Sequence, residues 1–211
     1  MTLIAFDFDG TLSDSEMTVL LGERAGVADE LAAITERAMN DEIGYAESLR
    51  TRAELLAGLP EAEAQSAFES VRLRPGAAEL LDDLRAAGHH VAILTGGFDR
   101  GVEGALAHHG TAVDEVVANR LHVVDGELSG EVSGPLVEGT KDDELAALAD
   151  REGVDLAATV AVGDGANDLP MLRVAGSAIG FAPKPAVEPH CDRVVDDFAA
   201  LRELFEAAGL L

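Results

Sequence analysis

Short apolar runs that alternate with stretches of helical spacing constrain this chain more than any other feature of its sequence. Each run has the length of a buried strand and is too short for a buried helix. Strands and helices that alternate in this way form βαβ units, which assemble into a mainly parallel sheet with helices on both faces. We therefore predict a doubly wound α/β fold. The apolar runs span residues 3–8, 91–94, 160–162, 178–181 and 194–195, and the helical stretches between them span residues 77–87, 102–109, 142–152 and 169–175.

Three of the apolar runs end in segments rich in Asp, Thr and Gly. In doubly wound sheets, ligands bind outside the carboxyl ends of the strands. We therefore expect these three segments to meet at one site. They are Asp7-Phe8-Asp9-Gly10-Thr11, Thr95-Gly96-Gly97-Phe98 and Gly163-Asp164-Gly165-Ala166-Asn167-Asp168.

Two regions depart from the alternation. Residues 14–71 contain helical patterns but no strand-like run, and an insertion directly after the first strand would lie above the expected site as a lid. We predict a core of residues 1–13 and 72–211 and a helical cap of residues 14–71. In residues 116–132, Asp125-Gly126 separates two extended segments, and Asp-Gly is a strong signal for a two-residue hairpin turn.

The charge of the chain narrows the classes of partner. Its 211 residues include 40 acidic and 15 basic side chains, for a formal net charge of −25. Such a surface repels nucleic-acid phosphates and anionic lipids, so we expect neither as a partner. Lys141 and Lys184 are the only lysines, and concentrated salt screens the repulsion among so many carboxylates. Our hypothesis is a protein from the cytosol of an extreme halophile, with an acidic mesophilic protein as the alternative.

Other global features add little to this picture. No run approaches the length of a membrane-spanning helix, and there is no basic leader, so we expect a cytoplasmic protein. The single cysteine, Cys191, excludes an internal disulfide and a cysteine-based zinc site. Monomer and homodimer both remain open.

Asp7 and Asp9 are paired carboxylates directly after a buried run. Such a pair permits one group to attack and the other to move protons, although Asp and Gly also end strands for structural reasons alone. Asp164 and Asp168 offer further carboxylates of the kind that Mg²⁺ prefers, and with Asp7 they would form a cage that needs a cation. A helix cap formed by Asp164 or Asn167 is the structural alternative.

Two further features are suited to bind an anion. Thr95-Gly96-Gly97 offers a hydroxyl and flexible backbone N–H groups, although a lone Thr-Gly-Gly is usually a turn. Lys141 supplies a compact positive charge at the start of the helix after the hairpin. Most lysines are solvated, but the scarcity of lysine here favours a specific role for Lys141.

The four motifs in this order resemble those of the haloacid dehalogenase superfamily of phosphotransferases. Within it, residues 95–98, 118–121 and 160–168 resemble segments of the phosphoserine phosphatases, and the resemblance covers nearly the whole chain. It implies hydrolysis of the small phosphate monoester O-phospho-L-serine to L-serine and phosphate, in serine biosynthesis. It also implies Mg²⁺ as the cofactor and an aspartyl-phosphate intermediate.

The same resemblance implies roles for individual residues. Asp7 resembles the nucleophile, and Asp9 resembles the acid that protonates the leaving oxygen and then activates water. The metal ligands would be Asp7, the backbone carbonyl of Asp9 and Asp164, with Asp168 supporting the metal or Lys141. The substrate-binding residues implied are Thr95, Gly96, Lys141 and Asn167 around the phosphate, and Glu16, Arg52, Met39 and Tyr45 in the lid. Of the lid residues, Glu16 would receive the substrate ammonium, Arg52 its carboxylate, and Met39 and Tyr45 its apolar part.

Alternatives to this function stay open. The nearest is an enzyme of the same superfamily that acts on phosphohomoserine, phosphothreonine or a sugar phosphate. A different class is a non-enzymatic phospho-acceptor, a receiver domain, but that reading leaves Asp9 and the insertion of residues 14–71 without a purpose. Departures from the relatives are few: Thr95 stands where Ser is usual, and Gly10 replaces a Ser found in some of them.

Overall fold

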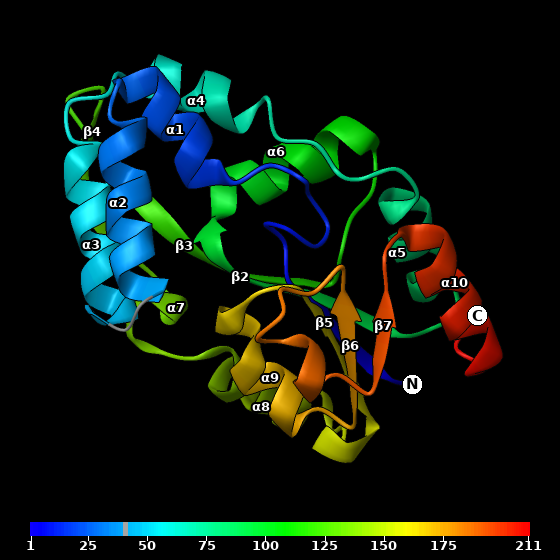
Figure 1. The fold of residues 1–211 in the computed structure, drawn as a ribbon. Coiled ribbons are helices and arrows are strands. Elements are labelled where there is room, and N and C mark those ends of the chain that lie inside the picture. The colour runs from blue at the N-terminus through cyan, green and yellow to red at the C-terminus, as the bar shows by residue number, and fades with distance from the viewer. Residues whose placement is uncertain (40–41) are drawn as a thin grey trace.

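The computed structural model describes the backbone of residues 1–39 and 42–211, and the side chains of the same residues except Met39. Seven strands form one sheet in the order β4-β3-β2-β1-β5-β6-β7 (Figure 1). All neighbouring strands are parallel except β3 and β4. The strands are β1 Leu3–Phe6, β2 His90–Phe98, β3 Glu115–Val124, β4 Glu127–Ser133, β5 Thr159–Gly163, β6 Ser177–Phe181 and β7 Arg193–Val195.

Helices follow the strands as the alternation predicts. The α-helices are α1 Met17–Ala25, α2 Ala28–Met39, α3 Tyr45–Leu55, α4 Glu61–Phe68, α5 Ala77–Ala86, α6 Asp99–His109, α7 Pro135–Glu138, α8 Lys141–Glu152, α9 Leu169–Val174 and α10 Phe198–Ala207. The doubly wound, mainly parallel α/β fold is therefore confirmed. No helix in the described part of the chain is long and apolar enough to cross a membrane.

The central strand β1 is buried on both faces of the sheet. Ile4 and Phe6 belong to a core shared with α5, α6 and α10, whereas Leu3 and Ala5 belong to a second core shared with α8 and α9. Side chains alternate across a strand, so a strand covered on both sides must be apolar throughout. The run at residues 3–6 meets this requirement, and it places the loop that follows at the centre of the sheet edge.

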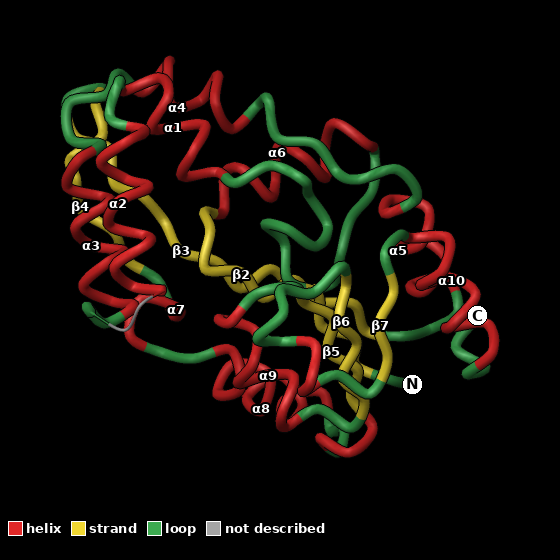
Figure 2. Tube along the Cα trace, viewed as in Figure 1, coloured by secondary structure: helices red, strands yellow, loops and turns green. Residues whose placement is uncertain are grey.

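Helices α1 to α4 gather at one end of the molecule, beside β4 (Figure 1). The two connections between them and the sheet run side by side (Figure 2). Ser13 and Leu73 form an antiparallel bridge between these connections, and the Arg74 N–H donates to the Leu12 carbonyl at 2.8 Å. The helical segment is therefore attached through two adjacent chain crossings.

The hairpin prediction is confirmed in detail. Asp125 and Gly126 have φ angles of 53° and 84°, and Val124 pairs with Glu127 across the turn. Two consecutive positive φ values are what a type I′ turn requires, and Asp-Gly is among the few pairs that adopt them readily.

The second strand is longer than the apolar run of residues 91–94. It continues through Thr95, Gly96 and Gly97 to Phe98. Its pairing with β3 is interrupted between Leu94 and Phe98, and resumes where Phe98 pairs with Asn119. The three residues thus form an irregular stretch inside the strand, and α6 begins directly after it.

Candidate active site

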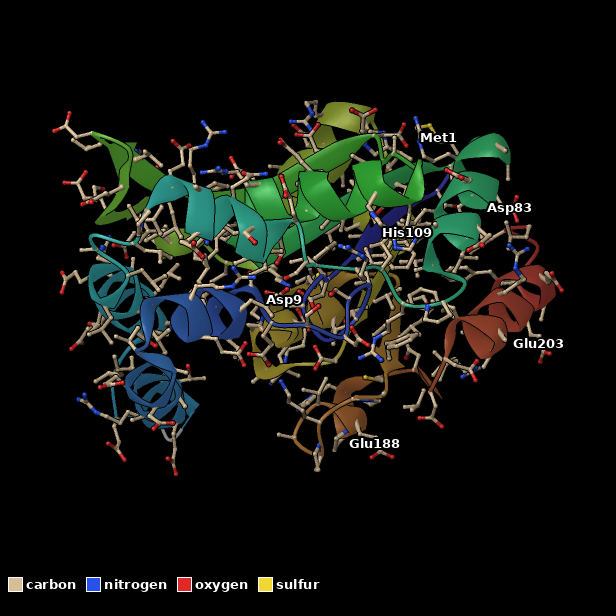
Figure 3. All side chains as sticks on the ribbon, turned by 90° about the horizontal axis from the view of Figure 1, so that it is seen from above. Met1, Asp9, Asp83, His109, Glu188 and Glu203 are labelled. Carbon is tan, nitrogen blue, oxygen red and sulfur yellow. The ribbon has the colours of Figure 1, made fainter. Side chains whose placement is uncertain are left out.

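The loop after β1 carries the first two carboxylates. Asp7 follows the strand directly, and its N–H donates to the Val162 carbonyl of β5 at 2.8 Å, so the sheet still holds its backbone. Its side chain is 2% exposed. Asp9 lies where α1 approaches the core (Figure 3), and its Oδ1 atom is buried.

Gly10 shapes this loop by bringing it against Asp164. Its φ angle is 93°, and a β-carbon on Gly10 would lie 2.7 Å from both carboxylate oxygens of Asp164. Glycine alone meets both the conformational and the steric condition without strain. A serine at this position would have to move the loop or the Asp164 carboxylate.

Lys141, the first residue of α8, pairs with two buried carboxylates. Its Nζ atom lies 2.5 Å from Asp7 Oδ1 and 2.6 Å from Asp168 Oδ1. No member of this trio is more than 3% exposed. Charges so far from water need close partners, so each of the three restrains the other two.

The loop after β5 supplies Asp164 and Asp168. The Asp168 Oδ2 atom accepts the N–H groups of Asp164 and Gly165, each at 2.9 Å. Both Asp168 oxygens therefore have protein donors, and this side chain holds the loop and Lys141 together. Asn167 is exposed in the short 3₁₀ turn Ala166–Asp168.

Burial dominates the electrostatics of the carboxylates. It raises the pKa of Asp7 to about 7, with repulsion from Asp168 adding to the effect and Lys141 opposing it. Burial also raises the pKa of Asp9 well above its usual value, with Asp7 and Glu16 adding to it. For Lys141, burial lowers the pKa, but the charges of Asp168 and Asp7 outweigh burial and raise it overall. The raised pKa favours the protonated form of Asp9, which suits proton donation to a leaving group.

The donor set at the sheet edge fits a divalent cation. Oxygens of Asp7, Asp164 and Asp168 lie within 4.8 Å of one another. Asp7 Oδ2 is buried and has no hydrogen-bond partner among the described residues. Hard cations prefer such oxygen ligands, and a cation here would offset the repulsion that raises the pKa of Asp7.

The irregular stretch of β2 lies on the other side of the same centre. Thr95 is 1% exposed, and its Oγ1 atom accepts the Gly97 N–H at 3.0 Å. A β-carbon on Gly97 would lie 2.9 Å from Asp9 Oδ2, so this glycine lets the stretch of β2 and the loop after β1 approach each other. The stretch therefore adjoins the Asp7–Asp9 loop, as the sequence predicts.

The helical segment adds charges above this centre. Glu16 is exposed at the start of α1, and its charge acts on both Asp9 and Arg52. Arg52 is half-buried on α3, where its Nε donates to the Ser48 carbonyl at 3.3 Å. In the part of the chain that the structure describes, no ion pair joins Arg52 to a carboxylate.

The remaining lid predictions have separate outcomes. Tyr45, the first residue of α3, reaches across to Gly96 of the core. The Met39 side chain lies outside the described residues, so its predicted contact is not addressed. Asn167 lies beside Gly165, and none of its described contacts joins it to Asp7 or Lys141.

The sequence was compared with known protein families and with individual proteins. Residues 4–173 match the haloacid dehalogenase-like hydrolase family. The chain belongs to this family. It is 56% identical over 210 residues to the phosphoserine phosphatase of Halobacterium salinarum, with all of both chains covered. It is 38% identical to the phosphoserine phosphatase of Methanocaldococcus jannaschii, with 97% of this chain and 96% of that one covered.

Solved structures of this hydrolase family include close neighbours of the fold. One is a phospho-aspartyl intermediate analogue of phosphoserine phosphatase, with a TM-score of 0.87, 38% identity and 98% of each chain covered. Another is a substrate-bound phosphoserine phosphatase complex, with a TM-score of 0.87, 37% identity, and 98% of this chain and 97% of that one covered. The fold and the sequence therefore place this hydrolase among the same relatives.

Sequence reasoning missed two side chains at the site of this hydrolase. Asn119 is fully buried on β3, where its Nδ2 donates to the Gly96 carbonyl at 3.0 Å and its Oδ1 accepts the Leu136 N–H at 3.1 Å. It thereby ties the irregular stretch of β2 to the start of α7.

The second missed side chain is Lys184, whose Nζ atom lies 3.4 Å from Asp164 Oδ2. The sequence did contain a signal for this residue. The scarcity of lysine that favoured a specific role for Lys141 applies equally to Lys184.

Proposed function

We propose that this chain hydrolyses O-phospho-L-serine to L-serine and inorganic phosphate in two steps at Asp7. The observation that carries the proposal is the Asp7 carboxylate itself. One of its oxygens is held by Lys141, while the other is buried and without a partner among the described residues. A carboxylate fixed in this way has one oxygen available for attack on phosphorus.

In the first step, Asp7 Oδ2 forms a bond to phosphorus as the bond from phosphorus to the serine oxygen breaks. The leaving oxygen takes the proton of Asp9, and the raised pKa of this buried carboxyl favours its protonated form. The products are L-serine and a phosphorylated Asp7. General acid help of this kind contributes roughly 10²–10⁴-fold to the rate.

In the second step, the Asp9 carboxylate takes a proton from water as the water oxygen attacks phosphorus. The bond from phosphorus to Asp7 breaks, so inorganic phosphate leaves and both carboxyl groups return to their first state. Lys141 neutralises charge on Asp7 throughout, and the backbone N–H groups of the stretch at Thr95 and Gly96 face the phosphoryl oxygens. Phosphoryl transfer depends on this positioning and charge neutralisation more than on covalent chemistry.

A Mg²⁺ ion is the cofactor we propose, held by Asp7, the backbone carbonyl of Asp9 and Asp164, with Asp168 supporting the loop and Lys141. When bound, it supplies charge neutralisation on the transferring phosphoryl group. Chelation is expected to abolish turnover, and addition of Mg²⁺ to chelated protein is expected to raise the melting temperature.

The lid residues account for the choice of serine. We propose that the helical segment of residues 14–71 is a cap on the core of residues 1–13 and 72–211. Arg52 would bind the substrate carboxylate and Glu16 its ammonium. Their charges act on each other and on Asp9, which supports a role for both side chains near the reacting carboxylates. A zwitterionic amino-acid phosphate complements such a pair better than a sugar phosphate does.

Phosphate release tests the proposal directly. We would compare O-phospho-L-serine, phosphothreonine, phosphohomoserine and p-nitrophenyl phosphate with Mg²⁺ at high KCl, using Asp7→Asn as the control. A strong preference for phosphoserine that Asp7→Asn abolishes supports the proposal. Equal, slow rates on all four substrates would move the substrate elsewhere in the family. Stable phosphorylation of Asp7 without turnover would support a receiver function instead.

We further propose that the protein is cytoplasmic and that it is a monomer or a homodimer. The composition favours the cytoplasm, and both a monomer and a homodimer are compatible with the proposed mechanism, in which one chain supplies every named group.

A further inference from the structure

Tyr45 is oriented unusually for a partly exposed tyrosine. Its side chain is 41% exposed, yet its hydroxyl end points inward, since a β-carbon on Gly96 would lie 2.1 Å from the hydroxyl oxygen. Amphipathic side chains normally bury the apolar body and keep the polar end in water. Tyr45 shows the opposite arrangement, because its hydroxyl lies against the core while the residue is partly exposed. This orientation therefore requires another explanation.

The surroundings of this hydroxyl belong to the reaction centre. Burial raises the pKa of Tyr45, while the charges of Arg52 and Lys141 oppose that rise and those of Asp7 and Asp9 add to it. Groups of both the lid and the core therefore act on one phenol. The described residues provide no hydrogen-bond partner for the hydroxyl, although Gly96 belongs to the stretch that faces the phosphoryl group in the proposed mechanism.

The contact with Gly96 also explains why that position is glycine. Any side chain there would displace the phenol, because even a β-carbon would overlap the hydroxyl oxygen. Gly96 is further held by Asn119, whose Nδ2 donates to its carbonyl at 3.0 Å. The receiving surface for Tyr45 is therefore fixed by the core, and the phenol that approaches it comes from the lid.

We propose that the Tyr45 hydroxyl donates a hydrogen bond from the lid to a phosphoryl oxygen of the bound substrate, next to Gly96. This inference rests on the proposed function for the identity of the substrate but concerns only its phosphoryl group. It assigns the phenol two tasks: the ring covers the mouth of the site, and the hydroxyl completes the set of donors around the phosphate.

Kinetics of Tyr45→Phe test the hydroxyl alone, because the ring is retained. A lost hydrogen bond to a charged group predicts a fall in kcat/KM of about tenfold. The fall should be equal for O-phospho-L-serine and p-nitrophenyl phosphate, since both carry the phosphoryl group. Thr51→Val is the matched control, because it removes a hydroxyl of the same helix that bonds only the Glu47 carbonyl, and it should leave both rates unchanged. An unchanged Tyr45→Phe, or a loss confined to phosphoserine, would overturn the proposal.

A spectroscopic measurement gives a second readout that does not depend on turnover. Tyr45 is the only tyrosine and the chain has no tryptophan, so the tyrosine absorption band reports this side chain alone. Addition of inorganic phosphate with Mg²⁺ should perturb that band, and the change should saturate as the phosphate concentration rises. In a competition assay against p-nitrophenyl phosphate, Tyr45→Phe should bind phosphate about tenfold more weakly than the wild type. Tighter phosphate binding by Tyr45→Phe would overturn the proposal, because it would mean that the hydroxyl occupies the phosphate position and is displaced.

These readouts separate the two claims. Phosphoserine could fail as a substrate while Asp7-dependent hydrolysis of p-nitrophenyl phosphate persists. The proposed function would then be wrong. The effect of Tyr45→Phe on the aryl substrate and on phosphate binding would still decide the role of the hydroxyl.

Discussion

Two cations near the candidate site, Lys141 in the core and Arg52 in the lid, differ in their burial and in their ion-pair partners. Lys141 is 3% exposed, and two carboxylates pair with it at 2.5 and 2.6 Å. Arg52 is half-buried, and its one described hydrogen bond is to a carbonyl of its own helix. A cation that is already paired serves to hold a constellation in place. A cation that forms no ion pair with the described residues is suited to bind an anionic group of the substrate.

The same contrast extends to the two regions. Core carboxylates are buried, mutually restrained and shifted in pKa, so they define the reaction. The lid residues Glu16, Arg52 and Tyr45 lie at or near the surface, and the Tyr45 hydroxyl reaches Gly96 of the core. We infer that the core performs phosphoryl transfer and the lid selects the molecule that carries the phosphoryl group.

The largest expected effect concerns Asp9. Asp9→Asn should lower kcat for phosphoserine by roughly 10²–10⁴-fold, because neither the proton donor nor the base for water remains. With p-nitrophenyl phosphate, whose leaving group needs no proton, the first step should continue and the second should stop. Rapid mixing should then show a burst of nitrophenol equal to the enzyme concentration. Asp7→Asn should give no burst, and steady turnover of Asp9→Asn at the wild-type rate would contradict the assignment.

The pH profile of kcat/KM sharpens the same assignment. Because burial raises the pKa of Asp9, its proton is retained to a higher pH than on a free carboxyl group and is lost as the pH rises through the folded-state value. The rate of the first step should therefore fall on the alkaline side of the profile. That limb should be absent from the burst rate with the aryl substrate, whose leaving group needs no proton, both in the wild type and in Asp9→Asn. An identical limb in the variant would assign it to another group.

Lys141→Met should be costly for the fold as well as for activity. It leaves Asp7 and Asp168 buried without their shared cation, which is expected to lower the free energy of unfolding by about 3–5 kcal/mol. Lys184→Met is the matched control. The Lys184 side chain is 52% exposed beside Asp164, so its loss should change stability by about 1 kcal/mol or less. Chemical denaturation of both variants would decide, and equal losses would refute the distinction between the paired core lysine and the exposed one.

Salt should produce the smallest and most diffuse effect. Repulsion among the carboxylates that project around the outline of the molecule is screened in concentrated salt (Figure 3). Raising KCl from about 0.1 M to about 3 M should increase the melting temperature by at least about 2–4 °C, which corresponds to about 1 kcal/mol. The difference in stability between wild type and Lys141→Met should stay constant, because that trio is shielded from salt. Equal melting at both concentrations would exclude adaptation to high salt.

Sequence reasoning succeeded where a local pattern forces a spatial outcome. A run that is apolar at every position from Leu3 to Phe6 must be covered on both faces, so the loop with Asp7 and Asp9 had to lie at the middle of a sheet edge. Asp125-Gly126 likewise indicated the hairpin turn, across which Val124 pairs with Glu127. The convergence of Asp7, Asp164 and Asp168 followed from strand ends and was predictable, whereas Lys141 was indicated by the scarcity of lysine.

It failed where the outcome depends on register across the sheet. Asn119 bridges Gly96 and Leu136 only because Phe98 pairs with Asn119 after an interruption in β2, and no pattern in residues 95–98 specifies that interruption. The inward hydroxyl of Tyr45 depends on how α3 lies over Gly96. A tyrosine at an apolar lid position gives no sign of which end faces the core.

The most direct test of the division between core and lid is the ratio of kcat/KM for O-phospho-L-serine to that for p-nitrophenyl phosphate in Arg52→Ala. The control is Arg50→Ala, which removes a neighbouring arginine of α3 that pairs with Glu138. Loss of a charged contact to the substrate carboxylate predicts a ratio that is about 10–100-fold lower in Arg52→Ala, through KM, and unchanged in Arg50→Ala. Parallel losses on both substrates in Arg52→Ala would contradict the account, because the lid would then serve the phosphoryl chemistry and not the choice of substrate.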